Sequence, residues 1–162
     1  DGVVNDAIKL DCPEDISQVH LIKLRLMNEK GEEVSQNFYW RSNDKYEGRK
    51  TLTGPATSGF EALSTLKQAK VKASVQGYVQ EGREYVKVRV KNTSGVIAFF
   101  TQLQLTDELG TPVRPAFFTD NFFSLLPGET REVVVDTKKT DGTQYRIVVK
   151  GWNQSRQDIL VK

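Results

Sequence analysis

The sequence predicts an all-β protein, and three observations lead to that expectation. In the segment YVKVRVK, Tyr85–Lys91, valines alternate with basic residues, so one face of the strand is apolar and the other is charged. Turn-forming runs such as NTSG, DELG and KTDGT separate segments of this kind at near-regular spacing. The helical signal is confined to one short stretch. Short strands between such turns are typical of an immunoglobulin-like antiparallel β-sandwich.

The front segment, residues 1–40, offers about three strands. Two of them form a hairpin that turns at NEKG, and one of these contains HLIKLRL, His20–Leu26. An immunoglobulin-like sandwich normally needs about seven strands. We therefore expect a partial sandwich here, the C-terminal part of a preceding domain whose first half is absent from this chain. Its unpaired strand edges would pack on the second domain, pair with another chain or fray.

Residues 41–59 are polar and rich in Gly, Ser, Thr and Pro, which is typical of a linker, and the domain boundary is expected there. At the end of this stretch, Ser58 and Glu61 match a capping box. The pattern predicts one or two helical turns over SGFEALSTLKQ, residues 58–68.

Residues 60–162 offer about seven strands and are predicted to form the complete sandwich. Besides the strand of alternating valines, the candidates are Val71–Val79, Val96–Leu105, Glu132–Asp136, Tyr145–Trp152 and Asp158–Lys162.

The candidate strand Val96–Leu105 is apolar on both faces in its first half and on one face in its second half. Such a strand is central in its sheet at one end, where a further segment of the protein covers its second face. Strict alternation places Ile97, Phe99, Thr101, Leu103 and Leu105 on one face, with Val96, Ala98, Phe100, Gln102 and Gln104 on the other.

Composition excludes several classes of protein. With 38% hydrophobic and 27% charged residues, the chain falls in the globular class. The net charge is only +2, and basic residues alternate along the strands instead of gathering in a patch, so no nucleic-acid partner is expected. No apolar run approaches the ~18 residues of a membrane span, so no membrane partner is expected either.

No cofactor and no metal site are expected. Phosphate-loop and GxGxxG patterns are absent. Zinc normally takes several His or Cys ligands, whereas the chain has one of each, His20 and Cys12. His20 lies in register with Ile22 and Leu24, so a structural role is expected.

Neighbouring carboxylates, such as Asp107 and Glu108, sit at turns, where solvent keeps both ionised, unlike the opposed pair of a glycosidase. Two triplets that begin at Asn92 and Asn153 match the N-glycosylation acceptor rule, which is often met by chance. Neither pattern predicts a catalytic or modification site.

The segment PAFFTDNFFSLLPGE, Pro115–Glu129, holds four of the eight phenylalanines and does not alternate like a strand. Asp120 and Asn121 interrupt the run and favour a turn. The aromatic residues could be core, a platform that stacks on sugars, or a docking surface for another module. The candidate contact residues are Phe118, Asp120, Asn121, Phe122, Phe123 and Trp152.

Four motifs carry a family resemblance: VSQNFYW at Val34–Trp40, IAFF at Ile97–Phe100, DNFFSLLPGE at Asp120–Glu129 and GWN at Gly151–Asn153. Together they resemble the C-terminal immunoglobulin-like region of glycoside hydrolase family 2 enzymes, in the β-mannosidase-like branch. Relatives tend to carry Trp-Ser where this chain has Phe118-Thr119, and the linker is longer here.

The resemblance implies a non-catalytic piece of a retaining glycosidase that acts on β-linked mannosides or related glycosides. The two catalytic glutamates of such enzymes lie on a (β/α)₈ barrel, which needs ~250 residues and so cannot be part of this chain. The expected partner is the remainder of the same polypeptide, with carbohydrate as a possible ligand, and an extracytoplasmic location is implied. Two alternatives stay open: a carbohydrate-binding module that uses exposed aromatics, and a tandem immunoglobulin-like adhesion or spacer protein.

Overall fold

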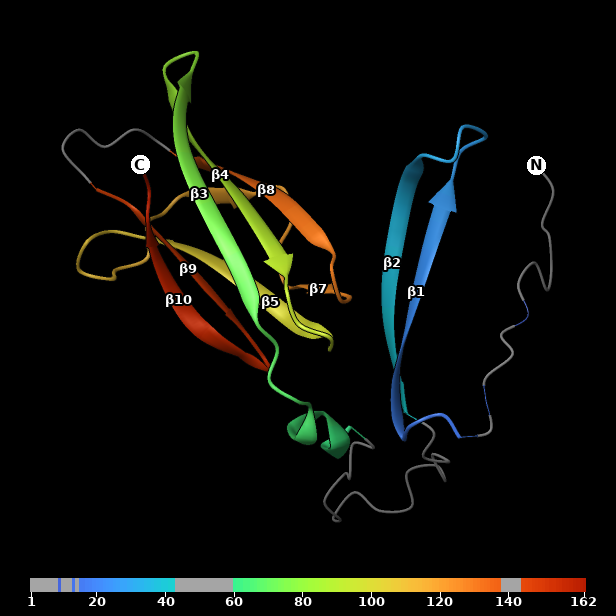
Figure 1. Ribbon diagram of the computed structural model, residues 1–162. Helices are drawn as coiled ribbons and strands as arrows, with labels where there is room; N and C mark the ends of the chain where they lie inside the picture. The colour runs from blue at the N-terminus through green and yellow to red at the C-terminus, as the bar shows by residue number, and fades with distance from the viewer. Residues whose placement is uncertain (1–8, 10–12, 14, 43–59, 138–143) are drawn as a thin grey trace, which may run out of the picture. The chain divides into compact units, whose positions relative to one another are not determined.

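The computed structural model describes residues 9, 13, 15–42, 60–137 and 144–162 (Figure 1). The chain divides into two compact units between Leu66 and Lys67, and each is considered by itself. The domain limits expected from sequence, 1–40, 41–59 and 60–162, remain a prediction.

The first unit contains an antiparallel hairpin of two strands, β1 (Val19–Met27) and β2 (Glu33–Ser42). Asn28 organises its turn, because the Asn28 side-chain oxygen accepts hydrogen bonds from the backbone N–H groups of Lys30 and Glu32. Gly31 occupies the left-handed backbone region at φ 76°. Part of the segment that would hold the third expected strand, residues 1–8 and 10–12, lies outside the described residues.

Several large apolar side chains of this hairpin are exposed, and Leu26 and Val34 each expose more than three fifths of their surface. A hairpin of two strands is marginally stable in water by itself. The exposed set is Leu26, Met27, Val34, Tyr39 and Trp40.

The short helical stretch is a 3₁₀ helix, η1 (Glu61–Thr65). Its N-cap is Phe60, which makes no side-chain cap hydrogen bond. Ser58, the first residue of the expected capping box, lies outside the described residues.

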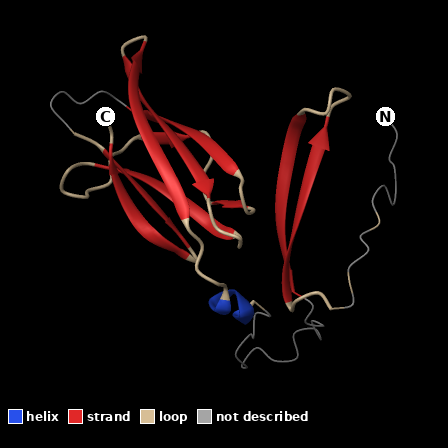
Figure 2. Cartoon of the chain, in the orientation of Figure 1, coloured by secondary structure: helices blue, strands red, loops and turns tan. Residues whose placement is uncertain are grey.

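The second unit is a sandwich of two four-stranded sheets, ordered β10-β9-β5-β7 and β3-β4-β8-β6, and every strand pair in them is antiparallel (Figures 1 and 2). This confirms the predicted fold class. The strands are β3 (Val71–Gln80), β4 (Arg83–Asn92), β5 (Ala98–Thr106), β6 (Ala116–Phe118), β7 (Phe123–Leu125), β8 (Thr130–Thr137), β9 (Arg146–Gly151) and β10 (Gln154–Leu160).

The core of the sandwich follows from the alternation seen in the sequence. Inward-facing valines of β4 and β8 pack against leucine, isoleucine and valine side chains of β5 and β9. Residues with at most 2% exposure include Val86, Val88, Val90, Leu103, Leu105, Val133, Val135, Ile147 and Val149.

Strict alternation fails at the start of β5. Ala98 belongs to the core cluster with Leu103 and Leu105, whereas Phe99 is buried outside that cluster. The expected assignment of faces is therefore wrong before Thr101. The cause is a shift of register between Ala98 and Thr101, where Phe100 adopts the left-handed region at φ 53°.

The phenylalanine-rich segment holds two strands that the sequence did not predict, β6 and β7. β6 pairs with β8 in one sheet, and β7 pairs with β5 in the other, so the segment passes from sheet to sheet. Each strand has only three residues, which is too short for a period of two to be visible.

Replacing Leu103 with Ala tests the core. Leu103 is 2% exposed, so the cavity should lower the free energy of unfolding by about 2–5 kcal/mol. Leu109, which is 91% exposed, is the matched control, and Leu109→Ala should stay within about 0.5 kcal/mol of wild type. Urea denaturation of both variants measures the difference. Equal midpoints would contradict this packing.

Candidate interaction surface at the β5–β7 edge

The structure separates the predicted contact residues into two groups. Phe123 is 7% exposed and belongs to the core, and Phe118 packs against that core. Phe122 and Trp152, in contrast, are 49% and 58% exposed. Of these four rings, those of Phe122 and Trp152 are the most exposed.

Asn121 serves the fold. Its side-chain oxygen accepts a hydrogen bond from the backbone N–H of Leu103 at 2.8 Å, and its side-chain N–H donates to the Leu103 carbonyl at 3.0 Å. The Asn121 side-chain amide therefore extends the hydrogen bonding between β7 and β5 further along β5. The same oxygen accepts a hydrogen bond from the Phe122 N–H at 3.0 Å, which holds the turn.

Asp120 also has an internal partner, because its carboxylate lies 3.5 Å from the guanidinium of Arg131. Arg131 in turn lies over the ring of Phe123, 5.9 Å from the ring centre. The two polar residues at the centre of the motif thus anchor the turn.

Phe122 lies against Phe100, with ring centres 5.3 Å apart. Both residues have left-handed backbone angles, φ 56° for Phe122 and φ 53° for Phe100. Bulky residues in this region cost of order 1–3 kcal/mol each, and such strain is often found at functional sites. Sequence analysis missed Phe100, since nothing in a single sequence reveals a left-handed phenylalanine.

Trp152 is tied to the same place on β5. Its backbone N–H donates to the carbonyl of Phe99 at 3.0 Å. Phe122 follows Asn121 on the β7 side of β5, whereas Trp152 lies on the β9 side. We call Phe100, Phe122 and Trp152 the aromatic ledge.

Next to Phe100 along the chain, two buried side-chain amides bond the backbone at the start of β5. The Asn153 oxygen accepts from the Phe99 N–H, and its N–H group donates to the carbonyls of Lys67 and Ile97. Gln154 donates to the Phe99 carbonyl at 3.1 Å and also bonds the hydroxyl of Thr101. Neither residue was singled out from sequence for this role.

Burial decides the question of the two glycosylation triplets. Asn92 is 0% exposed and Asn153 is 2% exposed. The Asn92 amide donates to the carbonyls of Val96 and Leu125. A glycan on either nitrogen would displace these bonds, so neither asparagine can carry one in the folded domain.

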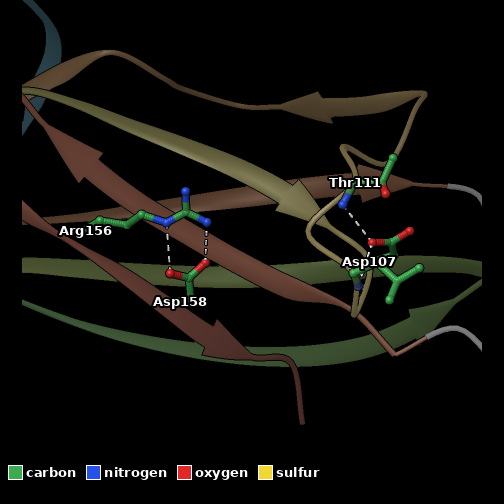
Figure 3. Close-up of polar contacts among 5 residues, drawn as sticks. Asp107, Thr111, Arg156 and Asp158 are labelled. Carbon is green, nitrogen blue, oxygen red and sulfur yellow. Dashed lines mark hydrogen bonds and ion pairs between the residues drawn. The ribbon is translucent and has the colours of Figure 1, made fainter.

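The clearest electrostatic effects are exposed ion pairs. The Arg156 guanidinium makes two hydrogen bonds to Asp158 and lowers the pKa of that carboxyl, while Asp158 raises the pKa of Arg156 (Figure 3). Arg89 and then Lys87 lower the pKa of Glu132 in the same way. All five side chains are substantially exposed. These ion pairs therefore shift pKa values at the surface and do not indicate a reaction centre.

Asp107, one of the neighbouring carboxylates of the sequence, serves a turn. Asp107 accepts hydrogen bonds from the backbone N–H groups of Leu109 and Thr111 (Figure 3). Among the described residues, no three His, Cys, Asp or Glu side chains gather where they could hold a metal ion. Within the same part of the chain, no helix is long and apolar enough to cross a membrane.

His20 is 8% exposed, in line with a structural position, and neither of its ring nitrogens has a hydrogen-bond partner. Cys12 lies outside the described residues.

Comparison with known proteins gives consistent matches. A family model described as the exo-beta-D-glucosaminidase Ig-fold domain matches residues 51–154. Over 98% of its length the chain is 30% identical to the exo-beta-D-glucosaminidase of Amycolatopsis orientalis and 31% identical to that of Streptomyces avermitilis. A mannosylglycoprotein endo-beta-mannosidase of Lilium longiflorum is 27% identical over 59% of the chain and 11% of its own length.

The crystal structure of the Amycolatopsis orientalis exo-chitosanase CsxA matches 96% of the chain with a TM-score of 0.81 and 29% identity. The chain spans 20% of that structure, and 16% and 19% of the two bacterial exo-beta-D-glucosaminidases.

Replacing Asn153 with Asp tests the amide network. The variant keeps the acceptor for Phe99 but turns a second oxygen toward two carbonyls, so unfolding should be easier by about 2–5 kcal/mol. Asn37 is exposed on β2, and Asn37→Asp is the control, with a change expected within about 0.5 kcal/mol. Urea denaturation gives both values. An Asn153→Asp variant as stable as wild type would refute the network.

Titration tests the ion pairs. Because its folded-state pKa is lowered, Asp158 adds stability that is present above the unfolded pKa and is lost as the pH falls through the folded value. Arg156→Gln should return the Asp158 pKa toward its ordinary value, as followed by NMR of the carboxyl carbon. Arg89→Gln is the control and should raise the pKa of Glu132 while leaving that of Asp158 in place. A pKa of Asp158 that ignores Arg156→Gln would refute the pair.

Proposed function

Because the chain belongs to the family of exo-beta-D-glucosaminidase immunoglobulin-fold domains, we propose that it is a non-catalytic accessory region of a glycoside hydrolase family 2 enzyme. The observation that carries the proposal is the match to CsxA, which extends over 96% of the chain and only 20% of that structure. A segment that recurs as one fifth of a much longer hydrolase is best explained as part of a similar hydrolase.

The reaction belongs to the remainder of the polypeptide. The parent enzyme hydrolyses β-linked glycosides through two carboxylates on a barrel, with retention of configuration. β-Glucosaminides are the favoured substrates, because the two relatives that match 98% of the chain carry that name. The β-mannosides expected from the family resemblance are the second choice, with support from the mannosidase of Lilium longiflorum.

The role of the chain is structural. The exposed apolar side chains of the hairpin, such as Leu26 and Val34, fit a hairpin that is completed by strands of the preceding part of the enzyme. The sandwich supplies a rigid module that packs against the rest of the protein. The match to long glycosidases favours this role over that of a free adhesion or spacer protein.

Activity of the purified chain and of the full-length polypeptide encoded by its gene tests the proposal. The substrates are nitrophenyl β-glucosaminide, β-mannoside and β-galactoside. We expect turnover by the full-length polypeptide, highest with the glucosaminide, and none by the chain alone. Turnover that copurifies with the chain through several columns would refute the non-catalytic role. A full-length polypeptide inactive on all three substrates would refute the parent activity.

A further inference from the structure

We propose that the aromatic ledge, Phe100, Phe122 and Trp152, is the surface through which the sandwich docks on an apolar surface elsewhere in the same polypeptide. This inference rests on the proposed function. It replaces the wider set expected from sequence, because Phe118 and Phe123 pack in or against the core and Asp120 and Asn121 bond within the domain. It also adds Phe100.

The backbone of the ledge is strained at two residues that carry aromatic rings. Glycine would fit the left-handed angles of residues 100 and 122 without strain, yet both positions carry phenylalanine. Specific bonds hold the two backbones: Ser124 accepts from the Phe100 N–H at 3.1 Å, and Asn121 accepts from the Phe122 N–H at 3.0 Å. Strain maintained by such bonds, with an aromatic ring left half-exposed, points to a contact outside the domain.

The chemistry of the ledge favours protein over sugar. A sugar site needs free polar groups around a concave surface to bind hydroxyls. Around the ledge, the amides of Asn121, Asn153 and Gln154 are already bonded to β5, and Ser124 accepts from it. An apolar ledge with its polar neighbours occupied suits an apolar partner.

The remainder of the polypeptide is the occupant that the comparisons favour. The chain spans only 16–20% of the relatives that it matches, so most of such an enzyme lies outside it. In the chain alone, Phe122 is 49% and Trp152 is 58% exposed, which leaves their apolar area available for that contact. Phenylalanine and tryptophan are among the residue types enriched in the cores of protein interfaces.

Hydrogen exchange in the full-length polypeptide and in the chain tests the inference. The N–H groups of Phe100 and Phe122 bond side chains instead of a strand, so they report local opening. We expect exchange around residues 97–126 to be slower in the full-length polypeptide by on the order of tenfold, corresponding to a modest docking energy. Equal exchange in the two proteins would overturn the proposal.

Three variants make the test specific. Phe122→Ala and Trp152→Ala should each remove most of that protection in the full-length polypeptide and leave exchange in the chain nearly unchanged. Phe117→Ala is the matched control, since Phe117 is 62% exposed on β6 in the other sheet, and it should leave the protection intact. Phe122→Gly removes the ring while accepting φ 56°, so it serves if the alanine variant folds poorly. Protection lost equally in the Phe117 variant would overturn the assignment.

Two further measurements on the chain identify other occupants. Shifts of the Trp152 indole signal on titration with glucosamine oligomers would assign the ledge to sugar. A concentration-dependent dimer that is abolished by Phe122→Ala would assign it to a second copy. Either result overturns the proposal. If the unmodified full-length polypeptide had no glucosaminidase activity, that result would instead count against the proposed function. Docking is measured by hydrogen exchange and needs no turnover.

Discussion

The sandwich depends on how the backbone N–H and C=O groups in the first half of β5 find hydrogen-bond partners. Buried N–H and C=O groups must be hydrogen-bonded, and an unpaired one costs about 1–3 kcal/mol. At Phe99 and Phe100 the register shift takes β5 out of the regular ladder with β7. Side chains supply the missing partners, Asn153 and Gln154 for Phe99 and Ser124 for Phe100. Without these partners, buried backbone groups of the bulge would be left without hydrogen bonds, and the backbone that carries the ledge would not be held in place.

This constraint explains why the sequence motifs have the residues they have. In DNFFSLLPGE, Asn121 bonds Leu103, Phe123 fills the core, and Glu129 accepts from the Leu126 N–H at 2.9 Å. In GWN, Gly151 lies so close to the Gln154 side chain that a Cβ there would collide with it. In these two motifs, Asn121, Phe123, Glu129 and Gly151 therefore serve the packing and hydrogen bonding of the sandwich.

The limits of sequence reasoning follow from the same physics. Alternation in β4 and the glycine turns could be read directly, because strand period and turn chemistry are local. The bulge at Phe100, the short strands β6 and β7 and the buried amides could not, since each depends on a partner distant in sequence. Asn153 was read only as part of an acceptor triplet, although it makes three hydrogen bonds to the backbone. Phe122 was identified among the candidates, but its pairing with Phe100 was not.

The exposed rings and the strained backbone of the ledge both carry a cost in free energy for the isolated domain. Apolar side chains in water favour association, so a domain that exposes Phe122 and Trp152 is less soluble than one with polar residues there. The strained backbone adds a further cost, against which the domain sets the ring contact between Phe100 and Phe122 and the hydrogen bonds from their N–H groups to Ser124 and Asn121. Both costs are recovered if the rings are covered in the longer polypeptide, where burial of each ring is worth about 1.5–3 kcal/mol. The side-chain hydrogen bonds to the Phe100 and Phe122 N–H groups have a second consequence: because they hold the backbone of both residues before contact, less conformational entropy is lost on docking.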